Sequence, residues 1–204
     1  MGRTSDARDR LLAAALDRIW SQSYGSISVD QICESAGVKK GSFYHFFASK
    51  EDLAVAAFEQ HWQRDIQPIV DRVFHPDRTP IERLEGWCQA IYEEQKQRFA
   101  ERGHVPGCPF ASLGSEVGTW NERLRRKVED LLERGLFQLE RALRDGQRDG
   151  SLVVADPAAR ARALHDMALG AMLRAKVEND PEVLRGLRAQ VLDLVRAPQR
   201  VGET

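Results

Sequence analysis

Residues 24–53 of the chain read YGSISVDQICESAGVKKGSFYHFFASKEDL. Ser28 followed three residues later by Gln31 is the pattern of a capping box, in which each residue caps the other's backbone at a helix start. Gly37 is the type of residue that ends a helix, and a second short helix is expected directly after it. Two short helices joined by a glycine-containing turn are typical of a helix-turn-helix motif, which we predict over about residues 28–47.

The rest of the chain has apolar residues at helical spacing, and alternation typical of a strand is sustained nowhere. A first helix is expected over about residues 4–24, and the helices after residue 50 are longer. The fold class is therefore predicted to be all-α, with about nine helices. Cap residues followed by proline mark three helix starts, at Thr79, Asp156 and Asp180, and the last two helices are expected over about 157–179 and 181–197.

The charge of the chain is nearly balanced, with 30 Lys and Arg against 31 Asp and Glu in 204 residues, a net charge of -1. This balance excludes proteins held on nucleic acid by bulk positive charge. We place a domain boundary after residue 50, where the helices lengthen. Residues 1–50 carry seven Lys and Arg against five Asp and Glu, a net +2, and residues 51–204 carry 23 against 26, a net -3. Any basic surface is predicted to be small and confined to the first domain.

Several classes of protein are excluded by what the composition lacks. Cys33, Cys88 and Cys108 are too few and too scattered for a disulfide framework and form no CxxC pair. The five histidines show no metal-ligand spacing, and the longest apolar run, residues 11–16, is too short to cross a bilayer. We expect a soluble cytoplasmic protein that is no enzyme and uses no cofactor, metal or membrane.

The thirty residues 24–53 resemble the DNA-binding domain of TetR-family transcriptional regulators. The resemblance rests on the turn Ala36-Gly37-Val38, on Gly41-x-x-Tyr44-x-Phe-Phe and on Ser49-Lys50-Glu51-x-Leu53. It implies a sequence-specific, DNA-binding transcriptional regulator with a C-terminal bundle for an effector and for dimerisation. It also implies that Ser28 contacts a DNA phosphate.

The residue types in this segment agree with binding to double-stranded DNA. The second helix of such a motif lies in the major groove with its first residues at base edges, where lysine can donate to guanine or phosphate and glycine allows close approach. The predicted DNA contacts are Ser28, Lys39, Lys40, Gly41, Ser42, Tyr44, His45 and Lys50. The alternative for the lysines is a solvated face, and for the aromatic residues it is the core, to which we assign Phe43, Phe46 and Phe47.

A second informative segment is residues 103–117, GHVPGCPFASLGSEV. It resembles a Gly-Cys-x-x-x-x-Leu-Gly-x-Glu segment in one TetR branch, that of the N-ethylmaleimide reductase repressor and the relatives of the lincomycin-resistance repressor. Cys108 directly precedes Pro109, at the expected start of a helix whose dipole favours a thiolate. We predict a sensor of electrophiles or oxidants, with Lys176 as a candidate partner that would stabilise the thiolate. The alternative is that Cys108 only packs its loop against the bundle.

An effector pocket inside the C-terminal bundle is the more general expectation, because such pockets are lined by apolar and aromatic residues with a few polar groups. The candidates are Trp62, Trp87, Tyr92, Phe110, Leu113, Trp120, Phe137, His165 and Met172. The alternative for each of them is a place in the core, where such residues are more often found. The sequence does not identify the effector.

The last two helices, numbered eight and nine in the predicted order, carry long apolar stripes. These comprise Ala163, Leu164, Met167, Ala168, Ala171, Met172, Val183, Leu187, Val191, Leu194 and Val195. Resemblance to the family implies a homodimer through these helices, and a twofold dimer reads a pseudo-palindromic operator. We therefore expect a repressor released by a small molecule or an electrophile. An activator or an effector-independent regulator is the alternative, and an enzyme of thiol chemistry is a remote one.

Overall fold

A computed structural model of the protein describes residues 2–196, with side chains from Asp6 onward. Its α-helices are α1 (Gly2–Ser21), α2 (Val29–Ala36), α3 (Lys40–Phe46), α4 (Lys50–His61), α5 (Gln67–Val73), α6 (Pro80–Arg102), α7 (Pro109–Val117), α8 (Glu122–Asp149), α9 (Pro157–Glu178) and α10 (Leu187–Arg196). A π-helical turn, Trp62–Ile66, joins α4 to α5 without a break, and a 3-10 helix, Pro181–Gly186, leads into α10. The described range thus holds nine helical segments, and the predicted all-α fold is confirmed.

The helix ends follow the cap residues of the sequence. At the start of α2 the Ser28 hydroxyl accepts the amide N–H of Gln31, and the Gln31 side chain accepts the amide N–H of Ser28. The same reciprocal pair joins Thr79 and Glu82 at the start of α6. Gly37 ends α2 in the left-handed conformation, with φ of 61°, a region in which glycine is strongly favoured.

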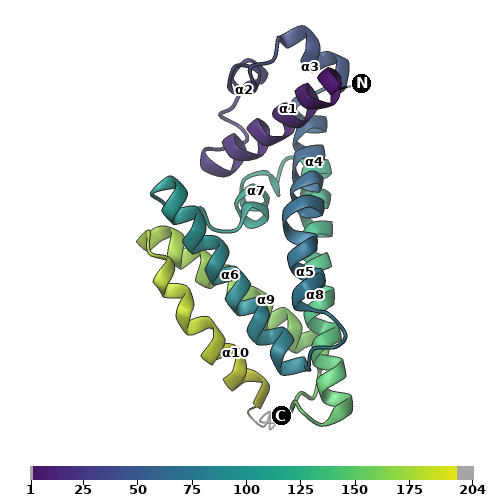
Figure 1. The fold of residues 1–204 in the computed structure, drawn as a ribbon, viewed down its shortest axis with the longest axis vertical. Coiled ribbons are helices and arrows are strands. Elements are labelled where there is room, and N and C mark those ends of the chain that lie inside the picture. Colours follow the sequence, from purple (N-terminus) through teal and green to yellow (C-terminus); the bar gives the residue numbers. More distant parts are fainter. Residues whose placement is uncertain (1, 197–204) are drawn as a thin grey trace. The chain divides into compact units, whose positions relative to one another are not determined.

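The chain divides into two compact units, and the first contains the residues up to Gln67 together with Pro109–Leu132. In this unit α1 packs against α2, α3, α4 and α7 (Figure 1). The core between these helices is built from fully buried side chains such as Leu11, Leu12, Phe43 and Phe58. The helix-turn-helix is therefore held by α1 and α4 rather than by its own two short helices alone.

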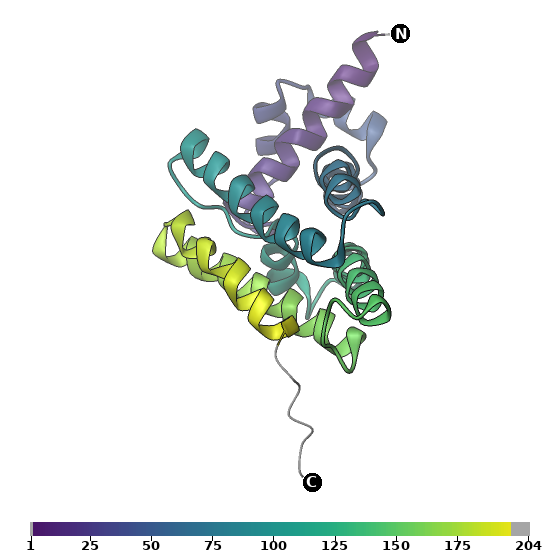
Figure 2. The ribbon, with the colours of Figure 1, turned by 60° about the horizontal axis from the view of Figure 1, so that its bottom comes forward.

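The second unit comprises Pro68–Cys108 and the described residues from Glu133 onward. Here α6, α9 and α10 lie side by side, as Figures 1 and 2 both show. Leu84, Leu139, Leu164 and Val191 are completely buried in the apolar core of this unit. The predicted boundary after residue 50 falls inside the first unit, so packing alone does not define the functional domains, and that boundary stays a prediction.

The apolar stripes expected to face a partner are mostly used within the chain. Leu164, Ala168, Leu187, Val191 and Val195 are buried in the core of the second unit, and Met167, Ala171, Met172, Val183 and Leu194 pack against its apolar clusters. These stripes therefore pack the last helices against α6 and α8 of their own chain, and the homodimer through these helices stays a prediction. Of the set, Ala163 is exposed.

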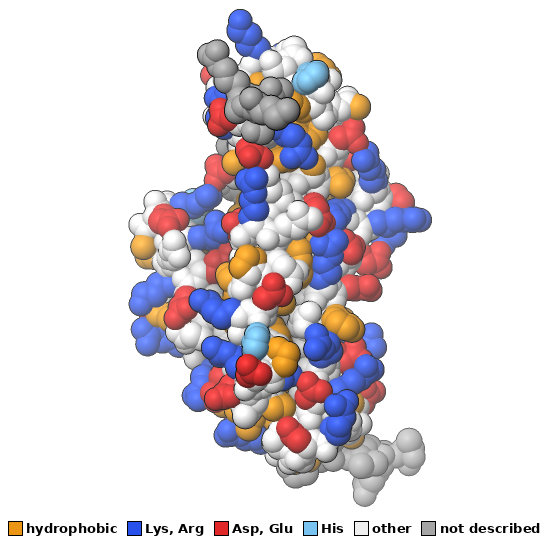
Figure 3. Space-filling model, turned by 45° about the vertical axis from the view of Figure 1, so that its right-hand side comes forward, with side chains coloured by type: hydrophobic (Ala, Val, Ile, Leu, Met, Phe, Trp, Pro, Cys, Tyr) orange, Lys and Arg blue, Asp and Glu red, His pale blue; other side chains and the backbone are white. Residues whose placement is uncertain are grey.

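Charged side chains of both signs are interspersed over the face shown in Figure 3. Within the described residues, the helices include none that is both long enough and apolar enough to span a bilayer.

Candidate nucleic-acid interface

The first turn of α3 is an exposed, polar helix start. Lys39 occupies the N-cap position with extended backbone angles, and Lys39, Lys40, Gly41 and Ser42 are all exposed. A Cβ atom added at Gly41 would meet nothing within 4 Å, so packing inside the chain does not require a glycine at this position. These four residues form the polar helix start that the sequence predicts.

The aromatic residues of α3 and of its C-cap position, Phe47, separate into buried and exposed members, as predicted. Phe43 and Phe47 are buried, with Phe46 half-buried. Tyr44 is 55% exposed and stands edge-on to Phe43 at 5.0 Å between ring centroids, while His45 is also exposed. The phenol hydroxyl and the imidazole are thus carried on a rigid helix whose opposite side is fixed in the core.

Two further features lie at the start of α2. Ser28 is exposed at the N-cap, and its hydroxyl accepts one amide N–H while keeping its own proton as a donor. In the first turn of α2, Asp30 binds the Nζ atom of Lys40 at 2.8 Å, and this hydrogen bond raises the pKa of Lys40. Part of the positive charge of α3 is therefore balanced by α2.

Lys50 differs from the other predicted DNA contacts. Its Nζ atom donates to the carbonyl oxygens of Tyr24 and Ile27, each at 2.8 Å, and lies 4.2 Å from the centroid of the Tyr24 ring. Burial lowers the pKa of this ammonium. In this structure the charge of Lys50 holds the turn between α1 and α2, an internal role that sequence position does not reveal.

Two residues with positioning roles have no counterpart among the predicted site residues. Arg10 of α1 donates from Nη1 to the carbonyl oxygens of Ala36 and Gly37, at 3.0 and 3.3 Å, and so fixes the turn between α2 and α3. Glu116 of α7 binds the turn before α2. The only signal for Arg10 in the sequence is a charged residue within the expected first helix, which is weak. Glu116 is the last residue of the quoted Gly-Cys segment, but its partners are more than ninety positions away.

In the second unit, the loop before Cys108 is held by side chains from α6 and α9. The buried Gln95 side chain accepts the amide N–H of Gly107 at 2.9 Å, and Asn179 accepts that of Val105 at 2.9 Å. Gly107 has φ of 73°, and a Cβ atom added there would lie 3.2 Å from Cδ of Lys176. The stem of Lys176 therefore lies against the residue that precedes Cys108.

The three cysteines differ in environment. Cys33 and Cys88 are buried, and Cys108 is half-exposed. Burial raises the pKa of Cys33, and it raises the pKa of Cys88 to about 12. Of the three thiols, that of Cys108 is the accessible one.

Two of the nine residues predicted to line an effector pocket lie instead on the surface. Trp120 and Phe137 are 58% and 56% exposed. Trp120 follows α7 and lies beside the Tyr24 ring, 6.1 Å between centroids. Phe137 shares an outward face of α8 with the exposed Arg141, whose guanidinium carbon lies 5.9 Å from the ring centroid. Both side chains therefore lie outside the core, and their assignment to an effector pocket stays a prediction.

The other seven fall into two sets. In the first unit Trp62 and Phe110 are buried 6.2 Å apart between ring centroids, and Leu113 is buried as well. The second unit holds Trp87, Tyr92, His165 and Met172, of which Tyr92 is buried and the others half-buried. Burial lowers the pKa of His165, which favours its neutral form.

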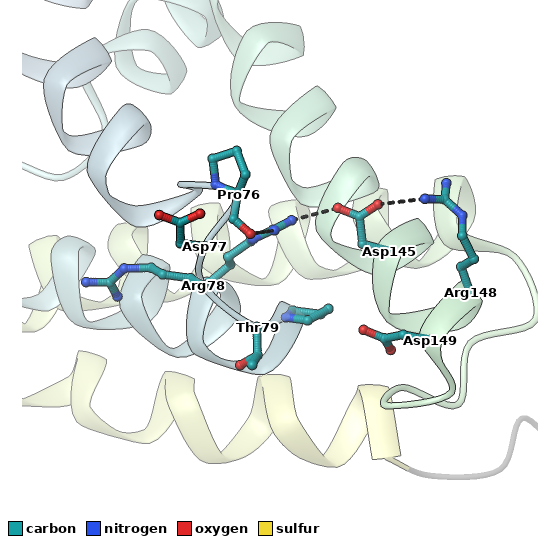
Figure 4. Close-up of a pocket in the computed structure, with 9 residues that line it drawn as sticks. Pro76, Asp77, Arg78, Thr79, Asp145, Arg148 and Asp149 are labelled. Carbon is teal, nitrogen blue, oxygen red and sulfur yellow. Dashed lines mark hydrogen bonds and ion pairs between the residues drawn. The ribbon is translucent and has the colours of Figure 1, made fainter.

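A polar pocket of about 380 Å³ opens in the second unit between the loop after α5 and the end of α8 (Figure 4). The buried Arg83 spans it, donating to Asp145 at 2.7 Å and to the carbonyl of Pro76 at 2.9 Å. Arg148 pairs with the other oxygen of Asp145. The lining has none of the predicted effector residues, and its paired charges anchor the loop to α8.

Comparisons with known proteins agree with this architecture. The model of bacterial regulatory proteins of the tetR family matches residues 11–57, and that of the tetracyclin repressor-like C-terminal domain matches residues 80–191. The HTH-type transcriptional repressor NemR of Escherichia coli (strain K12) is 27% identical over 95% of this chain and 96% of its own. The transcriptional regulator AcuR of Cereibacter sphaeroides is 32% identical over 87% of this chain and 80% of its own.

The likeness extends to three dimensions. The crystal structure of the reduced form of E. coli NemR matches with a TM-score of 0.78, covering 94% of this chain and 98% of that one at 27% identity. The two family models together span the helix-turn-helix and most of the C-terminal helices, and one relative is more than 30% identical. These matches identify the family of the chain. The chain belongs to the TetR family of transcriptional regulators.

Proposed function

We propose that this protein is a homodimeric repressor that binds a pseudo-palindromic DNA operator and is released by a small molecule or an electrophile. The observation that carries the DNA-binding part is the exposed first turn of α3, with Lys39, Lys40, Gly41 and Ser42 on a helix fixed by buried phenylalanines. TetR-family regulators bind DNA operators and act as dimers, and the relative NemR is named as a repressor. Both facts support the proposal.

In the proposed complex α3 lies in the major groove. Lys39, Lys40 and Ser42 are at its N-terminal end, where a recognition helix meets base edges. Tyr44 and His45 extend the exposed polar side of α3, and Ser28 at the start of α2 reaches a phosphate. Lys50 is the least supported member of the predicted set, because its ammonium already binds two carbonyl oxygens. Local charge rather than net charge supplies the affinity, so binding weakens as salt rises.

The DNA-binding proposal is tested with a duplex that the chain selects from a random-sequence pool. Fluorescence anisotropy between about 50 and 200 mM salt gives the slope of log affinity against log salt. We expect Lys39→Ala to reduce that slope by about one, as for loss of one phosphate contact, and Tyr44→Phe to weaken binding by about 3- to 10-fold through one lost hydrogen bond.

The control for this titration is Lys96→Ala, which removes an exposed lysine of α6 in the second unit. It should leave both the affinity and the slope unchanged. Failure to select any duplex, or equal effects of Lys96→Ala and Lys39→Ala, would contradict the assignment of α3 as the reading helix.

The homodimer is proposed to form through an exposed face of α9, joined by the last helix. Leu173 and Val177 are 62% and 77% exposed and lie four residues apart, on one side of the helix. Apolar side chains this exposed on one helix face are typical of an interface. They replace the buried stripe of the sequence prediction as the residues that would meet a second copy.

Sedimentation equilibrium tests this interface. The parent should sediment at twice the chain mass of 23.1 kDa, while Leu173→Asp and Val177→Asp should shift it towards the monomer because each buries an unpaired charge. Val153→Asp, at a valine outside α9 that is 54% exposed, should stay dimeric. A parent of monomer mass would overturn the dimer and the twofold operator together.

For the signal, we propose that Cys108 reacts with electrophiles or oxidants. Support comes from its half-exposed thiol directly before α7, and from the stem of Lys176 against Gly107. With N-ethylmaleimide as probe, the thiolate sulfur adds to the alkene carbon, the π electron pair takes a proton from water, and a thioether results. The adduct enlarges the side chain at the start of α7 and favours a conformation that does not bind the operator.

Operator release on treatment with N-ethylmaleimide tests the sensor. Cys108→Ser should retain operator binding and lose the response, whereas Cys88→Ser should respond like the parent because that thiol is buried. Lys176→Met should slow the reaction if the ammonium stabilises the thiolate. Release of the Cys108→Ser variant from the operator by N-ethylmaleimide would contradict the sensor proposal and leave a non-covalent effector as the signal.

A further inference from the structure

Glu116, in the last turn of α7, accepts three hydrogen bonds from the turn between α1 and α2. Oε1 accepts from the Ser23 hydroxyl at 2.7 Å and from the amide N–H of Gly25 at 2.6 Å, and Oε2 accepts from the amide N–H of Tyr24 at 2.8 Å. A Cβ atom at Gly25 would lie 3.1 Å from Oε1. One carboxylate thus satisfies two backbone donors and one side-chain donor of a single turn.

The carbonyl groups of the same turn are bound by a positively charged side chain. Lys50 of α4 donates to the carbonyl oxygens of Tyr24 and Ile27. Trp120, directly after α7, donates from Nε1 to the carbonyl oxygen of Glu116 at 2.7 Å and lies beside the Tyr24 ring. The turn is therefore held between a carboxylate on its N–H groups and an ammonium on its carbonyl groups, an arrangement in which both charges match the local dipoles.

This turn leads directly into the helix-turn-helix formed by α2 and α3. It ends at Ser28, the N-cap of α2, and α2 packs against α3. At the other end of α7, Phe110 packs against Phe58 and His61 of α4, with ring centroids 6.0 Å apart in both pairs. A displacement of α7 relative to α4 would therefore act on the turn that positions α2.

We propose that Glu116 is a positioning residue for operator binding, which fixes the turn before α2 from α7 and so makes the affinity for DNA depend on the position of α7. The inference rests on the proposed operator-binding function and deepens it, because α7 is the helix that begins directly after Cys108. A structural change at the start of α7 would reach the helix-turn-helix through the Glu116 carboxylate in the last turn of α7.

The sign of the effect separates positioning from simple electrostatics. Removing a negative charge from a DNA-binding unit reduces repulsion from phosphate and by itself strengthens binding. Positioning predicts the reverse, since Glu116→Gln keeps the shape but turns an NH₂ group towards a backbone N–H, so one donor of the turn loses its acceptor. The variant should bind the selected operator more weakly by about 5- to 30-fold, as expected for the loss of one charge-assisted hydrogen bond.

The experiment measures anisotropy with the selected duplex and with a scrambled duplex of the same length. Glu116→Gln should weaken operator binding without weakening binding to the scrambled duplex, for which only the removed charge matters. Ser23→Ala, which removes one of the three donors, should give a smaller loss than Glu116→Gln. The matched control is Glu129→Gln, the same charge change at an exposed glutamate of α8 in the same unit, which should not weaken binding.

Amide hydrogen exchange gives a readout that does not depend on DNA. The amides of Tyr24 and Gly25 should exchange faster in Glu116→Gln, while those within α1 and α4 keep the parent's rates if the unit remains folded. Faster exchange with unaltered operator affinity would overturn the positioning role and leave the repressor proposal intact. A parent that selects no duplex would instead overturn the repressor proposal. Unchanged exchange at both amides would show that the Glu116 carboxylate does not fix the turn, and would overturn the inference itself.

Discussion

The Nζ atom of Lys50 lies 2.8 Å from the carbonyl oxygen of Tyr24 and 4.2 Å from the centroid of the same residue's ring. A second carbonyl, that of Ile27, is bound at the same distance. Helix α4 therefore begins by tying down the turn that precedes α2, and the ammonium is half-buried by the chain that it holds. As a DNA contact, the Lys50 ammonium would bind a phosphate, whereas in the structure it binds two carbonyl oxygens of the turn before α2. These are two different roles for the same charged group.

Replacement of Lys50 by methionine distinguishes these two roles. Loss of hydrogen bonds to two carbonyl oxygens should lower the free energy of unfolding by about 1–3 kcal/mol, measured by urea denaturation. The salt slope of operator binding should stay that of the parent, because no phosphate contact is removed. A slope smaller by about one would instead show that Lys50 leaves the turn for a phosphate in the complex.

Asp30 holds Lys40 at 2.8 Å across the motif. We expect Asp30→Asn to tighten operator binding by about 2- to 5-fold, because one anion is removed from the DNA-facing side and Lys40 becomes available to phosphate. Anisotropy measures the change, with Glu34→Gln, at another exposed carboxylate of α2, as control for charge alone. Equal gains in the two variants would show that the ion pair itself has no role.

The three thiols should react in a fixed order. Burial raises the pKa of Cys33, and of Cys88 to about 12, which leaves almost no thiolate at neutral pH. Iodoacetamide followed by peptide mass spectrometry should therefore label Cys108 first, at least about tenfold faster than the other two. Comparable rates at Cys88 would indicate opening of the core of the second unit.

Acid should weaken the hold of α7 on the turn. Burial by itself raises the pKa of Glu116, but the hydrogen bonds from Gly25, Ser23 and Tyr24 and the charge of Lys50 outweigh it and keep the pKa below the ordinary 4.5. A carboxyl whose pKa is depressed by folding stabilises the protein above its ordinary pKa and loses that contribution as pH falls through the lowered value. The stability difference between the parent and Glu116→Gln should therefore be constant near pH 7 and shrink below about pH 4.5. Thermal melts over this range measure it, and a difference that grows in acid would contradict the lowered pKa.

Local signals in the sequence predicted most of the helix boundaries. Ser28 with Gln31, and Thr79 with Glu82, form the reciprocal caps that their spacing indicates, because a capping box involves only residues within one turn. The burial of Phe43 and Phe47 also agrees with their assignment to the core from the sequence. The same spacing did not separate a stripe that packs inside the chain from one that faces a partner, and Leu164 and Val191 proved to be core.

By itself the sequence determined the all-α fold, the helix-turn-helix and the family, because each depends on caps, turns and residue types that lie close together along the chain. Only the tertiary structure decided what the charged side chains bind. Lys50 and Glu116 lie 66 positions apart, yet both hold the turn around Tyr24. Hydrogen bonds between distant segments depend on how the helices pack. A single sequence gives the identity of each side chain but not its partner in the folded chain.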